Sequence, residues 1–388
     1  MSNPKSKFES LSNEILMIVF EHIEVGNLFY SFYNLNQRLN YLLLDHPLHF
    51  YCTIRSDSNR NNGHFFRRLY KDIILPKISN HIQSLTLIQC DDDDDDMLKT
   101  YYDDLFHFKN EDKKFVSLRL LTLDNLALKD MERILNQCSG LPNIKCLIIF
   151  NADSKENIKI SSIMKINSLC SFELSVKKEK YSILKPPYSF NMNDMTTMTT
   201  TLLNSIKYLT LHNCFALENL FLLCEHLPHL KFLTLNELNL WYKMNNIFSP
   251  YPLKCKVKFH LRIGYNTNFN HIEILLSNMP NLYSLNIEGG IEFDLTLSDG
   301  NSSSFLNSKR WEHLLIKLTN LKQLFIDLRT GFNDDKKSIL GHVKDILIPS
   351  FHKNDFLFKK CNFFLKVYPQ HNDKNFYHLR IVVCNDTL

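Results

Sequence analysis

Asp91–Asp96 is a run of six consecutive carboxylates, the densest group of potential metal ligands in the chain. Hard cations such as Ca²⁺ prefer oxygen ligands, so a metal-dependent hydrolase built on this run is one hypothesis. An EF-hand, however, needs alternating ligands and a central glycine, and the run has neither. Uniform charge of this kind is typical of a solvated loop, with docking of a basic partner as the functional alternative. We therefore predict no metal ligands here and interpret 91–112 as an inserted loop.

A cluster of basic residues lies just before a Met- and Thr-rich stretch: Lys177, Lys178, Lys180 and Lys185. We interpret 177–201 as a second inserted loop, because such biased segments seldom form a packed core. The functional alternatives are contact with a nucleic acid or an acidic partner, or a nuclear localisation signal.

Catalytic motifs are missing from the sequence. It contains no phosphate-binding P-loop, no G-x-G-x-x-G, no G-x-S-x-G and no H-E-x-x-H. His46 and His49 lie close together, but no carboxylate or cysteine follows them at ligand spacing. We therefore predict no enzyme activity, no catalytic residues and no cofactor.

Composition further limits which class of protein the chain can belong to. The 45 basic and 41 acidic residues give a net charge of +4, which predicts no dedicated nucleic-acid surface. No apolar run is long enough to cross a bilayer, so we expect no membrane contact. The ten cysteines form no C-x-x-C pair and favour a reducing compartment, the cytoplasm and/or the nucleus.

The first fifty residues predict three short helices. Apolar residues recur at helical spacing over 8–23, and Ser12 is placed to cap that helix. Gly26-Asn27 is expected to end it. A second helix is expected over 28–35 and a third over 37–44, ended by Pro47. A unit this small usually packs against a partner or the next domain.

The first predicted helix also carries a motif. The stretch Leu11–Phe20 resembles the F-box signature, in which Leu-Pro-x-Glu-Ile-Leu is followed by Ile/Val-Phe and a three-helix hook. Ser12 stands where the family usually has Pro, and the later part of the family pattern is not evident. By this resemblance, the residues expected to contact an adaptor are Phe8, Leu11, Ser12, Ile15, Leu16, Val19, Phe20 and Leu28.

The resemblance implies that residues 1–50 dock on a Skp-type adaptor and its cullin scaffold, within an SCF-type ubiquitin ligase. Docking of this kind inserts an apolar helical face into a groove on the partner. The alternative is that the three helices only cap the end of a repeat domain.

A degenerate repeat fills the rest of the chain. Each copy reads apolar, Pro or Thr, Asn or His, Leu or Ile, two variable residues, then two apolar residues separated by one. The clearest copies are Leu141–Ile149, Leu227–Leu235, Met279–Ile287 and Leu318–Ile326. Weaker copies begin near 82, 118, 169 and 206, and a hidden one is expected over 257–263. The shortest separations are about 25 residues.

These segments resemble leucine-rich repeats, which supply one short strand per repeat. The linking stretches 126–135, 216–224, 271–279 and 308–318 have helical spacing. We predict an α/β fold with an N-terminal three-helix F-box over 1–50 and a helical linker over 51–80. An irregular leucine-rich-repeat solenoid follows over 81–388, with a curved parallel sheet and outer helices. Strands near 363–368 and 378–384 are expected to form a terminal cap.

Alternation along each predicted strand separates buried leucines from residues on a concave face. Leu85 and Leu87, Leu209 and Leu211, and Leu233 and Leu235 are expected to point inward. The residues predicted to bind an unidentified protein substrate on the other face are Tyr208, His212, Phe232, Asn236, Phe325 and Asp327. An F-box hook followed by such repeats is a known family arrangement, in which the repeats receive the protein to be ubiquitinated. The leading hypothesis is therefore a substrate-recognition adaptor, and the alternative is an interaction scaffold without a ligase role.

Overall fold

The fold was obtained as a computed structural model. It describes residues 8–44, 48–56, 75–89, 115–152, 165–176, 205–212, 226–238, 256–264, 269–290, 307–333, 363–370 and 373–385, and single positions at 163, 220, 223, 224, 267, 305, 349 and 353. The chain divides into two compact units, Met1–Lys177 and Lys178–Leu388. The loops expected over 91–112 and 177–201 lie outside the described residues.

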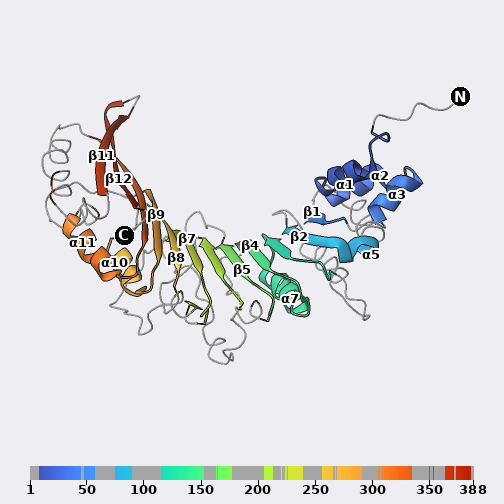
Figure 1. The fold of residues 1–388 in the computed structure, drawn as a ribbon, viewed down its shortest axis with the longest axis horizontal. Coiled ribbons are helices and arrows are strands. Elements are labelled where there is room, and N and C mark those ends of the chain that lie inside the picture. The colour runs from blue at the N-terminus through green and yellow to red at the C-terminus, as the bar shows by residue number, and fades with distance from the viewer. Residues whose placement is uncertain are drawn as a thin grey trace. The chain divides into compact units, whose positions relative to one another are not determined.

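The first unit begins with three helices and continues into a parallel sheet (Figure 1). Strands β1 to β5 pair in chain order, and each pair is parallel. Helix α7 connects β3 to β4 and buries one apolar side, which includes Met131, Ile134 and Leu135. The elements are α1 (Asn13–Glu21), α2 (Val25–Phe32), α3 (Gln37–Leu44), β1 (Phe50–Ser56), α5 (Leu75–Ile78), the 3₁₀ turn Ser79–His81, β2 (Ile82–Gln89), β3 (Leu120–Asp124), α7 (Leu128–Cys138), β4 (Cys146–Ala152) and β5 (Ser171–Val176).

The second unit continues the alternation of strand and helix. Strands β6 to β10 pair in parallel in chain order, and β12 then adds antiparallel to β10, with β11 outside it. The antiparallel hairpin therefore ends the parallel sheet. The elements are β6 (Tyr208–His212), β7 (Phe232–Leu238), β8 (Lys258–Ile263), α10 (Phe269–Ser277), β9 (Ser284–Gly290), α11 (Ser308–Lys317), β10 (Gln323–Asn333), β11 (Phe363–Gln370) and β12 (Asp373–Asn385).

The chain is therefore an α/β protein built on parallel strands, as its sequence predicts. The alternate leucines of the repeat are the core: Leu85, Leu209 and Leu233 are each at most 1% exposed. The hidden copy expected over 257–263 is strand β8, in which buried and accessible residues alternate. Burial of about one residue in two on most of these strands is the physical reason for the repeat, because one face of the sheet forms the core.

The asparagine of the repeat links consecutive copies. Asn143 Nδ2 donates to the backbone oxygen of Val116 at 2.6 Å, and Asn320 Nδ2 donates to that of Pro280 at 3.2 Å. Both bonds reach back to the preceding copy, where they satisfy a carbonyl outside the regular strand pairing. The recurrence of Asn at this position follows from that bond.

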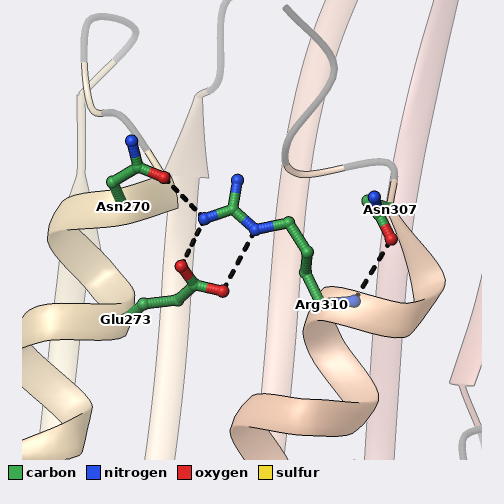
Figure 2. A network of polar contacts seen from close by, with 4 residues as sticks. All are labelled: Asn270, Glu273, Asn307 and Arg310. Atoms are coloured by element: carbon green, nitrogen blue, oxygen red, sulfur yellow. Dashed lines mark hydrogen bonds and ion pairs between the residues drawn. The ribbon is translucent and has the colours of Figure 1, made fainter. Parts of the chain in front are cut away.

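An ion pair joins helices α10 and α11 (Figure 2). Arg310 on α11 donates from Nε to Glu273 Oε1 on α10 at 3.1 Å, and its Nη2 pairs with Glu273 Oε2 and with Asn270 Oδ1. Its guanidinium also lies 4.8 Å from the centroid of the Phe269 ring. Arginine is suited to this place because it can bind a carboxylate with two bonds and stack on an aromatic ring at once.

The structure corrects two local predictions. Residues 51–80 were expected to be a helical linker, but Phe50–Ser56 is strand β1, with Phe50, Cys52 and Ile54 buried. That alternation is a strand signal of period two. Gly26-Asn27 was expected to break a helix but lies inside α2, which begins at Val25 because a Glu24 oxygen accepts from the Asn27 amide at 3.0 Å.

Candidate functional site

Helix α1 is apolar on two sides. Leu16 and Phe20 are fully buried among the three helices, whereas Ile15 is 48% and Ile18 59% exposed. Residues three and four apart share one side of a helix, so Ile15, Ile18 and Val19 form an outward stripe. Leu11, in the segment just before the helix, is also partly accessible. We call these four residues the α1 stripe. A helix that only had to pack against its own domain would need one apolar side.

The start of α1 is held by helix α3. Arg38 donates from Nε to Asn13 Oδ1 at 2.8 Å and from Nη1 to the Glu9 backbone oxygen at 2.6 Å. Its Nη2 donates to the Leu11 backbone oxygen at 2.5 Å. These bonds fix the segment that precedes the helix, and with it the direction in which the α1 stripe faces.

Ser12 caps α1 as its sequence position predicts. Its side chain accepts from the Ile15 amide at 3.5 Å, which is a long bond. A hydrogen bond from the backbone and a second from the Ser12 hydroxyl lower the pKa of Glu14 in the first turn. A negative charge there suits the amino end of a helix, so Ser can begin this helix where the F-box family usually has Pro.

The eight residues predicted to contact an adaptor fall into three groups. Ser12 and Ile15 are exposed, and Phe8, Leu11 and Val19 are partly buried; Leu16, Phe20 and Leu28 are completely buried. The buried three build the core of the helical hook and offer no surface to a partner. The sequence reading omitted Ile18, although its spacing of three from Ile15 is the signal that would have found it.

The hook is also attached to the sheet of its own unit. Phe29 on α2 lies edge-to-face against Phe50 on β1, with ring centroids 6.3 Å apart. Lys77 Nζ donates to the Tyr33 hydroxyl at 2.7 Å. The first contact fixes the three helices at strand β1 and the second fixes them at helix α5, so the hook is positioned by packing as well as by the chain connection.

The second candidate surface is the accessible face of strands β6 to β10. Register places the residues of this face in three rows that cross the strands; all but the buried Asp327 are at least partly accessible. The first row is Tyr208, Phe232, Lys258, Ser284 and Gln323; the second is Thr210, Thr234, His260, Asn286 and Phe325; the third is His212, Asn236, Arg262, Glu288 and Asp327.

Aromatic and cationic groups meet in the first row. The rings of Tyr208 and Phe232 stack with centroids 5.0 Å apart and planes 12° apart. Lys258 Nζ lies 5.4 Å from the Phe232 centroid on the next strand. Tyr208 is nevertheless 45% exposed, so a large aromatic surface remains open to solvent. Rings that are fixed by stacking but still exposed are typical of binding surfaces.

The third row is rich in polar contacts. Asn236 Nδ2 lies 3.1 Å from His212 Nδ1, and Asn286 of the second row donates to Glu288 Oε1 at 3.0 Å. Asp327 is almost fully buried, and Arg329 binds both of its oxygens, at 2.7 and 3.3 Å. The Asp327 carboxylate is thus already bound by Arg329 within the protein, so it is less available to contact a ligand.

All six residues predicted to bind a substrate lie on this face, and four of them form two adjacent pairs. Phe325, in the second row, is 37% exposed. The sequence reading missed Lys258, His260 and Arg262, which occupy the three rows on β8. It recognised that strand as a hidden copy, so the same alternation would have identified them.

Within the described residues, no group of three or more His, Cys, Asp and Glu side chains is placed to hold a metal ion. The Asp91–Asp96 run lies outside those residues. None of the described helices is long and apolar enough to span a membrane. Burial raises the pKa of the Cys138 thiol to about 12, as expected of a cysteine that packs as a small apolar residue.

Comparison with known proteins adds no family assignment. No protein-family model matches the sequence, and a search of curated proteins finds no significant match.

Proposed function

We propose that the chain is a substrate-recognition subunit of an SCF-type ubiquitin ligase. Its three-helix hook docks on a Skp-type adaptor, and the accessible face of β6 to β10 receives the target protein. The chain itself then performs no chemistry; it brings the target to the ligase. The α1 stripe is the observation that carries this proposal, because Leu11, Ile15 and Val19 match the F-box signature in sequence, and Ile15 and Ile18 remain about half exposed after the hook has folded.

Energetics favour a partner for the stripe. Burying a fully exposed Ile side chain contributes about 1.5 to 3 kcal/mol. Ile15 and Ile18 are about half exposed, so covering both would contribute about 2 kcal/mol. Three apolar residues on one short helix, with Leu11 just before it, also fit the mode in which an amphipathic helix enters a hydrophobic groove.

The test replaces exposed residues only. Ile15→Asp with Ile18→Asp places two charges on the stripe, and the buried Leu16 and Phe20 stay in place. Ile316→Asp on α11 is the matched control, because Ile316 is 52% exposed in the other unit. Affinity purification from cells, read by mass spectrometry, should recover Skp-type adaptor and cullin with the parent chain and the control. The double variant should lose both.

A scaffold without a ligase role is the second candidate. The contacts of Phe29 with Phe50 and of Lys77 with Tyr33 favour it, because a simple end cap needs only such attachments. If this candidate holds, the parent chain recovers no adaptor, and the double variant keeps the same partners as the parent.

A further inference from the structure

Exposed lysines recur where strands β6 to β10 begin. A lysine directly precedes β6 (Lys207), β7 (Lys231) and β10 (Lys322). Lys256 lies just before β8, and Lys258 is the first residue of β8. The backbone amides at these positions continue the ladder from strand to strand, with Lys231 donating to the Lys207 carbonyl at 2.8 Å. Neighbouring strands are about 4.8 Å apart, so the lysines form a closely spaced positive edge.

The carboxylates of the same strands lie elsewhere. Glu288 and Asp327 belong to the third row. Four residues of strand separate the first row from the third, which is about 13 Å. Among the described residues of β6 to β10, the amino-terminal edge therefore carries basic groups only, and the acidic groups begin farther along the strands.

Aromatic rings are interleaved with these lysines. Lys258 lies against Phe232, and Lys256 Nζ lies 4.6 Å from the centroid of the Tyr283 ring. The Tyr208 ring extends the same edge and is 45% exposed. The surface thus offers positive charge and flat apolar area side by side, within reach of a single extended chain.

We infer that this edge binds an extended acidic segment of a partner protein, whose carboxylates pair with the lysines while an apolar side chain covers Tyr208. The inference rests on the proposed function only in calling that partner a ligase substrate. The positive charge of the lysines favours an acidic peptide, and the exposed Tyr208 ring favours an apolar residue within that peptide. We name the surface formed by Tyr208, Phe232, Lys231, Lys256 and Lys258 the basic aromatic edge.

A nucleic acid fits the same surface less well. The whole chain carries a net charge of only +4, so it has little long-range attraction for a polyanion. A broad phosphate backbone would also approach Glu288, about 13 Å away from the first row. A peptide that follows the first row contacts the lysines and rings and leaves that carboxylate in solvent.

The full chain can be titrated with a short labelled peptide in which Glu alternates with Leu, and binding followed by fluorescence anisotropy. Matching peptides with Gln in place of Glu, and a labelled single-stranded DNA, serve as the other probes. Lys258→Glu and Tyr208→Ala change the edge. Lys309→Glu is the matched control, because Lys309 is an exposed lysine of α11 outside these strands and makes the same change in net charge.

The Glu-Leu peptide should bind, and its affinity should fall as salt is added. Loss of one charge-assisted contact predicts about tenfold weaker binding for Lys258→Glu, and loss of the anchor ring predicts about the same for Tyr208→Ala. Lys309→Glu should bind like the parent chain. Equal binding of the Gln-Leu peptide, tighter binding of DNA, no binding of any probe, or equal effects of Lys309→Glu and Lys258→Glu would each overturn the inference. None of these results depends on adaptor binding by the hook, so the two proposals fail separately.

Discussion

Gly289, on strand β9, provides a stringent test of how tightly neighbouring repeats pack. It pairs with Ile263 on β8, and its φ of +139° lies where residues with a side chain are strained. A Cβ added at Gly289 would overlap the carbonyl oxygen of Ile263 and come within 3.0 Å of its carbonyl carbon. The close neighbours are backbone atoms of a paired strand, which cannot move without disturbing the sheet.

Two effects determine how much the free energy of unfolding falls in Gly289→Ala. Holding a residue with a side chain in this backbone region costs about 1 to 3 kcal/mol. Forcing an extra methyl group into a packed site costs about 1 to 3 kcal/mol more. The free energy of unfolding should therefore fall by about 2 to 6 kcal/mol, enough to lower the melting temperature by about 4 °C or more for a unit of this size.

Gly264 supplies the control, because a Cβ there meets no atom within 4 Å. Gly264→Ala should be neutral, or more stable by about 0.5 kcal/mol through a lower entropy of the unfolded chain. Urea unfolding followed by circular dichroism and by tryptophan fluorescence measures both variants, since Trp311 is buried in the same unit. Equal stability of the two variants would refute the reasoning about the close approach of β8 and β9.

Two further predictions concern helices α10 and α11. Arg310→Met removes the bond to Glu273 and the stacking on Phe269, so urea unfolding should show a loss of about 1 to 2 kcal/mol. Glu273→Gln combined with Arg310→Met should cost less than the sum of the single changes, and strict additivity would contradict a coupled pair. Burial lowers the pKa of His271 below its ordinary value of 6.5. The unfolded chain therefore takes up this proton first, so stability present above pH 6.5 is lost as the pH falls from there through the lower folded pKa. His271→Gln should flatten the dependence of the melting temperature on pH in that window, and an unchanged profile would exclude His271 as its cause.

The sheet could be predicted from the sequence because one physical rule repeats along it. A strand with one buried face needs an apolar residue at every second position, and Leu209 with Leu211 shows this plainly. The same rule located β8, although its lysine and arginine obscure the repeat. Helices α7, α10 and α11 appeared where apolar spacing had predicted them, within a few residues.

Strand β1 was missed because its neighbours in sequence look helical. Phe50, Cys52 and Ile54 alternate correctly, but a run this short competes with the helical pattern before it. The start of α2 was also misplaced, because Gly26 was taken as a helix breaker. Tertiary packing overrides that weak tendency: Gly26 is buried, and Glu24 caps the helix in front of it.

The hook surface was predicted only in part. Sequence spacing placed Ile15, Leu16 and Phe20 on one broad apolar side, yet the fold buries Leu16 and Phe20 and leaves Ile15 outside. Which apolar residues of a helix meet the core depends on the direction from which α2 and α3 pack. That direction comes from long-range contacts such as those of Arg38 with Asn13, which no local pattern reveals.

Docking through the α1 stripe is tested most directly by the affinity of the purified full chain for a purified Skp-type adaptor, measured by calorimetry. It predicts specific binding that Ile15→Asp with Ile18→Asp weakens about thirtyfold or more, from the loss of about 2 kcal/mol of apolar burial and the cost of two buried charges. The control Ile316→Asp should bind like the parent chain. No binding by the parent chain, or equal affinity of the double variant and the parent, would contradict the proposal that the α1 stripe is the docking surface.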